Sequence, residues 1–373
     1  MKKTILFLLL LSFVCKAQSP ETKKDDTAAK LKITIKGLFQ ARYSFNNDKD
    51  IDLTGLHHTD SLAVYNGFDI KRARLLFASK ISDRTEVVLL VNLADFKNDP
   101  KNKVLENAYL TYKLSNYINF KIGQFRPAFG LENMYSVDVI KSMDYSNQYS
   151  AFGSNGWQSF QIGASVYGTI KGEHTINYAL SVVNGNNRNQ VMDADNGKQF
   201  SSRMDLLLNK KYNLKAGLNG AIGSVYKSDV YAAGIDLSGV LPFSEKWSLL
   251  FEAEAKQGNN HVLFYKTPVA NRIQNVSQYQ MQGMYFLPDL RYDVNYHRLT
   301  SLEFSCRYEY FDPNFKNNSN PRQTFTPMIS AEFLKSYNAR IQLGVIIDRY
   351  KKNSIETTQY SNEQFIIQIQ SRL

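Results

Sequence analysis

Apolar side chains alternate with polar ones over many short segments of the chain. In the segment Ile33 to Phe45 the odd positions are almost all apolar, and the even positions hold most of the polar side chains. Successive side chains of a β-strand point to opposite faces, so a period of two predicts strands with one apolar and one polar face. The alternation recurs at 108–114, 160–166, 176–182, 247–255 and 339–347. The chain is therefore predicted to be all-β.

No segment after residue 17 approaches the ~20 consecutive apolar residues that a membrane-spanning helix needs. The longest apolar run, Val87 to Val91, has only the length of a strand. Tilted strands of ~10 residues do cover the apolar band of a membrane barrel. A helical membrane protein is therefore excluded, whereas a membrane barrel is not.

The predicted strands are joined by links of two alternating lengths. Short turns are predicted at 82–84, 115–116, 171–173, 210–212, 242–246 and 334–337, and long loops at 47–66, 96–103, 127–157, 185–198, 258–277, 312–322 and 351–361. Two links break the rule, a short loop at Gly223–Ser228 and a long turn at Pro288–Arg298. Short turns at one end and long loops at the other are typical of an outer-membrane barrel. Counting strands between the links predicts an antiparallel up-and-down transmembrane barrel of about sixteen strands.

The amino terminus has the organisation of a secretory signal. Lys2 and Lys3 precede an apolar stretch, Thr4 to Val14, which is followed by Cys15-Lys16-Ala17. This order predicts a cleaved signal peptide over residues 1–17. Cys15 also admits a lipoprotein signal, but the bulky Val14 before it argues against one. We expect residues 18–30 to be a periplasmic lead-in and residues 31–373 to form a barrel in the outer membrane of a Gram-negative bacterium.

A large secreted β-sandwich or solenoid would also show alternation. Removal of the signal leaves Cys306 as the only cysteine, so no internal disulfide can stabilise such a fold. A sandwich would also have loops of mixed length at both ends. A sheet of this many strands must close or split, which favours the barrel.

The charge balance is basic, at +11 for the chain and +8 after residue 17, and export argues against nucleic acid as the partner. A Lys or Arg facing lipid costs ~2–4 kcal/mol at the membrane midplane, so charged strand residues are predicted to face the lumen. These include Arg42, Arg72, Arg74, Arg203, Arg307 and Arg340. A ladder of guanidinium groups would favour anions. Alternatively, acids on the same faces, such as Asp205 and Glu309, pair with these arginines across the wall.

Several segments are similar to those of one known family. They are GQFRPAFGLE at Gly123 to Glu132, INYALSVVNG at Ile176 to Gly185, the late strands at Tyr285–Leu287 and Leu302–Asp312, and the basic run Lys71 to Arg74. In order and spacing these segments resemble the phosphate-selective porins O and P. The resemblance implies a sixteen-stranded barrel, usually trimeric, that passes solutes by diffusion, with phosphate or polyphosphate favoured in characterised members.

The resemblance further implies that the third long loop, Pro127 to Trp157, folds inward and narrows the pore. Where the family tends to show an acid–arginine pair, this loop reads Val139-Ile140-Lys141-Ser142. Lys141 keeps a positive charge but lacks the fork of an arginine, so anion preference is implied and phosphate specificity stays open. Arg126 and Lys141, near or within this loop, are the predicted contacts of a permeating anion.

Two other functions are considered. A barrel with a plugged lumen would serve as a binding or adhesion protein, with Tyr135, Tyr145 and Tyr149 facing outward. A barrel hydrolase would need a histidine with a nucleophile or an acid, and the chain has five histidines and neither GxSxG nor HExxH. His57 and His58 lack the spacing of metal ligands. We therefore expect neither enzymatic activity nor a metal or other cofactor.

Overall fold

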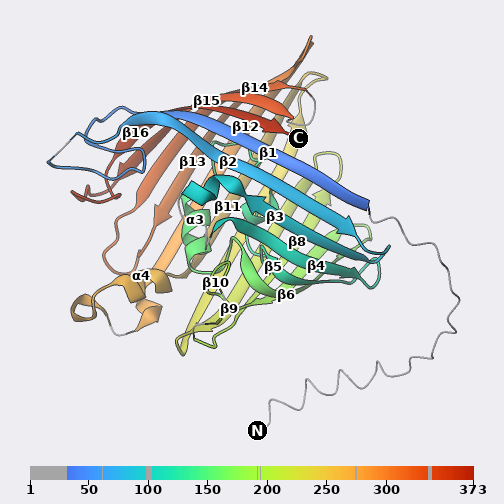
Figure 1. The fold of residues 1–373 in the computed structure, drawn as a ribbon, viewed down its shortest axis with the longest axis horizontal. Coiled ribbons are helices and arrows are strands. Elements are labelled where there is room, and N and C mark those ends of the chain that lie inside the picture. The colour runs from blue at the N-terminus through green and yellow to red at the C-terminus, as the bar shows by residue number, and fades with distance from the viewer. Residues whose placement is uncertain are drawn as a thin grey trace, which may run out of the picture. The chain divides into compact units, whose positions relative to one another are not determined.

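The computed structural model describes residues 32–373, except residues 61, 98–102, 191, 194, 274 and 335–337. Within these residues, sixteen antiparallel strands form one closed barrel (Figure 1). The strands are β1 (Lys32–Asn46), β2 (Asn66–Lys80), β3 (Thr85–Asn92), β4 (Leu105–Lys113), β5 (Asn119–Phe125), β6 (Gln161–Ile170), β7 (Ile176–Val183), β8 (Gln199–Asn209), β9 (Leu214–Val225), β10 (Ser228–Pro242), β11 (Trp247–Asn259), β12 (Gln280–Tyr296), β13 (Leu299–Asp312), β14 (Arg322–Phe333), β15 (Ala339–Tyr350) and β16 (Asn362–Arg372). β16 closes the barrel by pairing with β1, which confirms the predicted architecture. The predicted signal peptide and lead-in, residues 1–30, lie outside the described residues.

The links between strands follow the predicted rule, with one correction. The short loop at Gly223–Ser228 is present, because β9 ends at Val225 and β10 begins at Ser228. The long turn predicted at Pro288–Arg298 is wrong, since β12 continues to Tyr296. Proline cannot donate to a strand ladder and therefore indicated a strand end. In the structure the β12–β13 pairing resumes directly after it, at Asp289 opposite Ser305.

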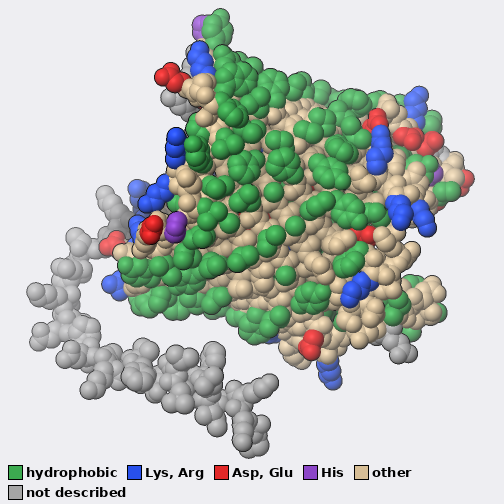
Figure 2. Space-filling view, turned by 180° about the vertical axis from the view of Figure 1, so that it is seen from behind, with side chains coloured by type: hydrophobic (Ala, Val, Ile, Leu, Met, Phe, Trp, Pro, Cys, Tyr) green, Lys and Arg blue, Asp and Glu red, His purple; other side chains and the backbone are tan. Residues whose placement is uncertain are grey.

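The two faces of the barrel wall differ as the alternation predicted. The outward side chains are mostly apolar, as Ile35 illustrates with 62% of its surface exposed. Figure 2 shows these apolar side chains covering the middle of the wall, with the charged side chains gathered toward its two ends. The six arginines predicted to face the lumen are all buried inside the barrel. An apolar belt between charged rims matches the requirements of a lipid bilayer.

The longest loop, residues 126–160, lies inside the barrel and is called the third loop below. It contains η2 (Glu132–Met134) and α3 (Asn147–Ser154), and α3 contacts the wall at β12 and β13 (Figure 1). The other helical turns are η1 (Leu93–Lys97), α4 (His261–Lys266), η3 (Val269–Asn271) and η4 (Val276–Gln278). No helix in the described part of the chain is long and apolar enough to cross a membrane.

An apolar cluster joins the third loop to another long loop at the same end of the barrel. Phe129, Phe152 and Trp157 of the third loop pack in one cluster with Phe264 and Tyr279 of the sixth loop, residues 260–279. Burying large apolar side chains contributes about 1.5–3 kcal/mol each. The inward fold of the third loop is therefore stabilised by apolar packing as well as by polar contacts.

Candidate functional site

The third loop turns into the lumen at Gly130, where any residue with a side chain would be strained. Gly130 has φ +82°, and a Cβ there would lie 2.4 Å from Gln158 Nε2 and 2.6 Å from Glu254 Oε1. The N–H groups of Gly130 and Leu131 donate to Asn219 Oδ1 and Glu254 Oε1 at 2.8 and 2.7 Å. The Gly-Leu pair of the GQFRPAFGLE segment thus attaches the loop to the wall at β9 and β11.

Asp144 attaches the middle of the third loop to the opposite wall. Its carboxylate lies 2.7 Å from Arg72 Nη2, 3.0 Å from Lys71 Nζ and 3.6 Å from Arg42 Nη1. Arg42 also donates to the carbonyl oxygen of Met143. Burial alone would raise the pKa of Asp144, but the three cations outweigh it and hold this pKa well below its usual range. The carboxylate therefore stays charged, and it occupies a place where three cations converge.

Lys141 binds the third loop to a further part of the wall. Its ammonium group pairs with Glu303 of β13 and lies 3.5 Å from Asp289 Oδ2 of β12. Only 6% of the side chain is exposed. One residue earlier, the carbonyl oxygen of Ile140 accepts a hydrogen bond of 3.1 Å from Arg340. Lys141 and Arg340 are thus placed in the contact between the loop and the wall, and their predicted contact with a permeating anion stays a prediction.

Three other predicted arginines have acidic partners. The pairs are Arg74 with Glu106 at 2.7 Å, Arg203 with Asp236 at 2.6 Å, and Arg307 with Glu309 at 2.7 Å. Arg307 also donates to the carbonyl oxygen of Asp144, at 2.6 Å. Of the two interpretations of the arginines, pairing across the wall agrees with this geometry. A contact of these arginines with a solute would have to compete with the resident carboxylates.

Glu132 makes the docking of the third loop sensitive to pH. Its carboxylate accepts hydrogen bonds from the N–H and hydroxyl of Ser146 and lies 3.5 Å from Arg307 Nη1. Burial, which outweighs the opposing effect of Arg307, raises the pKa of Glu132 from 4.5 to about 7. A carboxyl whose pKa is raised in the docked state favours docking fully below its ordinary pKa, and this contribution is lost as the pH rises through about 7.

Protease cleavage within the third loop is therefore expected to become faster as the pH rises from about 4.5 to about 7. Substitution Glu132→Gln removes the titrating group and should abolish most of this dependence. The measurement is limited proteolysis of the detergent-solubilised barrel at several pH values, with rates corrected for the pH profile of the protease on an unfolded substrate. An unchanged profile in the variant would contradict the assignment to Glu132.

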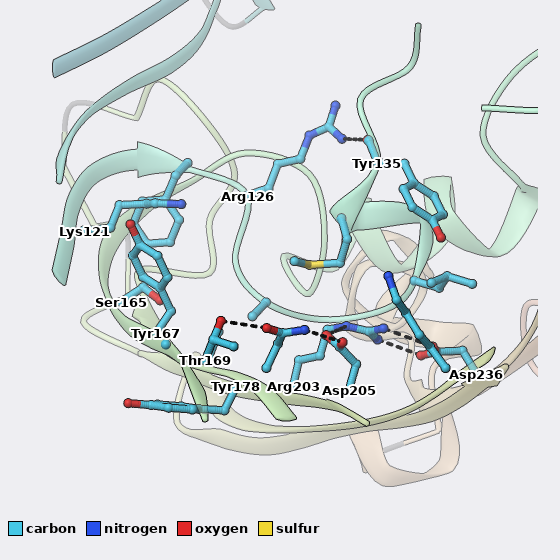
Figure 3. A pocket seen from close by; sticks show the side chains of 18 of the residues that line it. Lys121, Arg126, Tyr135, Ser165, Tyr167, Thr169, Tyr178, Arg203, Asp205 and Asp236 are labelled. Carbon is cyan, nitrogen blue, oxygen red and sulfur yellow. Dashed lines mark hydrogen bonds and ion pairs between the residues drawn. The ribbon is translucent and has the colours of Figure 1, made fainter. Parts of the chain in front are cut away.

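A cavity of about 440 Å³ lies between the start of the third loop and the wall formed by β5 to β10. Its floor is a chain of polar groups that satisfy one another (Figure 3). Thr169 donates to Asn177 at 2.7 Å, Asn177 donates to Asp205 at 2.9 Å, and Arg203 donates to Asp236 at 2.6 and 3.0 Å. These groups are therefore already engaged and hold the shape of the cavity.

Three cations at this cavity have no carboxylate partner among the described residues. Lys121 of β5 and Lys215 of β9 make no ion pair, and Arg126 donates to Tyr135 O and Tyr145 Oη, both at 2.8 Å. Together with Arg203, Asp205 and Asp236, the cavity has four cations and two acids, a formal excess of +2. Arg126 lies beside this cavity at the start of the third loop, and its predicted contact with a permeating anion stays a prediction.

A second cavity, of about 690 Å³, lies toward the loop end of the barrel. It is lined by Lys103, Arg188 and Lys266 together with residues of the third loop and of the fourth loop, residues 184–198. The ring of Phe160 lies between the two cavities. Its centroid is 4.8 Å from the guanidinium carbon of Arg126 and 5.4 Å from that of Arg188. Basic side chains therefore lead from one cavity to the other along one side of the lumen.

The sequence interpretation missed Lys121, Lys215 and Asp144. The signal for the lysines was present, because Lys121 stands between the outward-facing Phe120 and Ile122. The prediction of anion contacts considered mainly arginines, and the lysines on the same faces were therefore left out. Asp144 lies two positions beyond 139–142, the segment in which the family resemblance implies an acid–arginine pair.

Residues 39–206 match the model of a protein family. The family is that of the phosphate-selective porins O and P. The match includes strands β1 to β8 and the third loop, and it confirms the resemblance seen in the sequence. The segments Tyr285–Leu287 and Leu302–Asp312 lie outside the matched residues. A comparison with curated protein sequences gave no match.

Solved outer-membrane structures, a porin among them, share the fold of this chain. An anion-selective porin from Comamonas acidovorans has a TM-score of 0.60 at 10% identity, covering 92% of this chain and 100% of its own. The outer membrane channel DcaP of Acinetobacter baumannii scores 0.58 at 14% identity, covering 96% and 100%. A loop-deletion mutant of OmpT from Vibrio cholerae scores 0.58 at 11% identity, covering 92% and 99%. At these identities the likeness shows the fold alone.

Proposed function

We propose that this chain is an outer-membrane porin through which small anions diffuse, phosphate among them. The long loops then face the outside of the cell, and the short turns face the periplasm. The closed barrel, its apolar outer belt and the family match support a channel. The anion-selective porin of the same fold is consistent with the preference for anions.

The observation that carries the anion preference is the excess of cations at the 440 Å³ cavity. Fixed positive charge in a narrow, partly water-excluding passage lowers the barrier for anions and raises it for cations. Most other lumenal cations are neutralised by carboxylates of the wall or of the third loop. The selective charge is therefore expected along the side of the lumen that holds Lys121, Arg126 and Lys215.

We also infer a homotrimer, which the resemblance implies and with which the trimer form of OmpT from Vibrio cholerae, at a TM-score of 0.55, is consistent. A belt of lipid surrounds such an assembly. The transport role leaves no need for a catalytic group or a cofactor.

A specific observation favours the alternative of a binding or adhesion protein with a plugged lumen. The third loop lies inside the barrel and is bound to opposite walls through Asp144 and Lys141. The associated expectation that Tyr135, Tyr145 and Tyr149 face outward is wrong, because Tyr135 and Tyr145 pack against a buried apolar cluster inside the barrel. Tyr149 is buried, and its ring stacks on that of Tyr145 inside the barrel with centroids 4.1 Å apart.

Reconstitution of the mature chain in a planar bilayer separates the two functions. Across a KCl gradient we expect open-channel conductance and a reversal potential of the sign set by chloride. The charge-neutralising variant Arg126→Gln should move the reversal potential toward zero, whereas Lys227→Gln in the exposed β9–β10 loop should not. A cation-selective reversal potential would contradict the anion preference alone. Absence of conductance would contradict the channel and support the binding protein.

A further inference from the structure

We propose that the 440 Å³ cavity beneath the third loop is a binding site for organic anions, namely carboxylates attached to a ring or a short carbon body. The proposal rests on the proposed function as a channel and names the class of solute that its narrow part holds. A volume of about 440 Å³ falls within the ~300–1,000 Å³ typical of small-molecule sites.

One side of the cavity is apolar. Phe125, Ala128, Leu131 and Met134 line it where the third loop begins, and Tyr167 of β6 lines the adjoining wall. Inorganic phosphate is held by charged and polar donors, and the four side chains from the start of the third loop offer none to it. A carbon body, in contrast, gains about 25 cal/mol for each Å² of apolar surface that it buries there.

The other requirement is a cation placed to meet a carboxylate. The ammonium group of Lys121 lies 4.8, 5.4 and 5.1 Å from the ring centroids of Tyr109, Phe125 and Tyr167. The three rings fix the position of the ammonium group and strip part of its water. A desolvated cation without a carboxylate partner attracts an anion more strongly than a fully hydrated one. Lys215, on the opposite part of the same wall, supplies a second such charge.

The arginine of the cavity floor favours a carboxylate ligand over phosphate. Phosphate recognition commonly uses the bidentate fork of a guanidinium group. The fork of Arg203 is already occupied, because two of its nitrogen atoms donate to Asp236 at 2.6 and 3.0 Å. Incoming anions therefore meet the two lysines and Arg126, whose Nη1 already donates to Tyr135 O and Tyr145 Oη, beside apolar side chains and rings.

The experiment compares blockers of the chloride current through the full mature barrel in a planar bilayer. Benzoate is expected to reach half-block at a concentration about 10-fold lower than phosphate or acetate. Lys121→Gln should raise the half-blocking concentration of benzoate about 10-fold, because one hydrogen bond to a charged group is lost. Lys227→Gln, which changes a lysine outside the cavity, should leave it unchanged. Equal block by benzoate and phosphate in the unaltered barrel would overturn the proposal.

Two further measurements keep the test decisive. If Lys121→Gln fails to fold, Lys215→Gln removes a cation of the same cavity from another strand and should show the same change. Calorimetric titration of the detergent-solubilised barrel with benzoate measures binding without conduction. Benzoate binding without conductance would contradict the channel and support the site. Conductance with neither block nor benzoate binding would overturn the site and leave the channel intact.

Discussion

Replacement of Lys141 by glutamate is expected to release the third loop from the β12–β13 wall. The change removes the only cation that pairs with Asp289 in the described structure and places a third carboxylate beside Asp289 and Glu303. Breaking a buried ion pair from one side costs about 3–5 kcal/mol, because the remaining charge stays buried without compensation. We expect a loss of this size in the free energy of unfolding, together with higher conductance and weaker anion preference.

Urea unfolding in detergent, proteolysis within residues 126–160 and bilayer recordings together measure this effect. The control Lys246→Glu makes the same change of charge in the exposed β10–β11 turn and should leave all three measurements near those of the unaltered protein. A variant at Lys141 that changes selectivity while its unfolding and proteolysis stay normal would show direct contact with the permeating anion. That outcome would confirm the prediction from the sequence.

Replacement of Asp144 by asparagine is the second change with a large expected effect. It leaves Arg42, Lys71 and Arg72 facing a neutral amide, so three cations repel one another in a partly buried place. A loss of about 3 kcal/mol in docking shifts the equilibrium between the docked and undocked third loop about 100-fold. Conductance should rise because the lumen widens, and anion preference should strengthen because the three cations lose their carboxylate.

The direction of the selectivity change distinguishes the two variants. Asp144→Asn and Lys141→Glu both loosen the third loop, but the first exposes cations and the second adds an acid. Asp229→Asn, at an exposed position near the loop end of β10, is the matched control for Asp144. Unchanged conductance in bilayer recordings of Asp144→Asn would contradict a constriction held by this carboxylate.

These contacts attach the third loop to two walls of the barrel. Asp144 binds the side of β1 and β2, and Lys141 binds the side of β12 and β13. We infer that the pathway for a solute follows the remaining side, past Arg126 and Phe160 to Lys121. Because the attaching pairs are buried, salt is expected to weaken them less than it weakens exposed pairs.

The strand pattern could be predicted from the sequence because it is a local property. A residue such as Arg42 in the middle of a strand faces lipid or lumen, and the cost of a charge in lipid decides which. The same reasoning applied to Lys121 would have found it. The wrong prediction of a long turn at Pro288–Arg298 also rested on a local feature. Proline lacks a backbone N–H donor, but β12 pairs with β13 both before and after Pro288, so the strand is not interrupted.

The sequence by itself therefore determined the barrel, the number of its strands and the inward direction of its charges. Its resemblance to a known family also indicated that the third loop lies in the lumen. Only the tertiary structure decided which charges are neutralised. Asp144 and Arg42 are 102 positions apart in the chain, and Lys141 and Glu303 are 162 apart, so no local period relates them. Coulombic attraction depends on distance in space, and the closure of the barrel around the third loop sets that distance. This is why Lys121 and Lys215 have no acidic partner among the described residues, while most of the arginines have one.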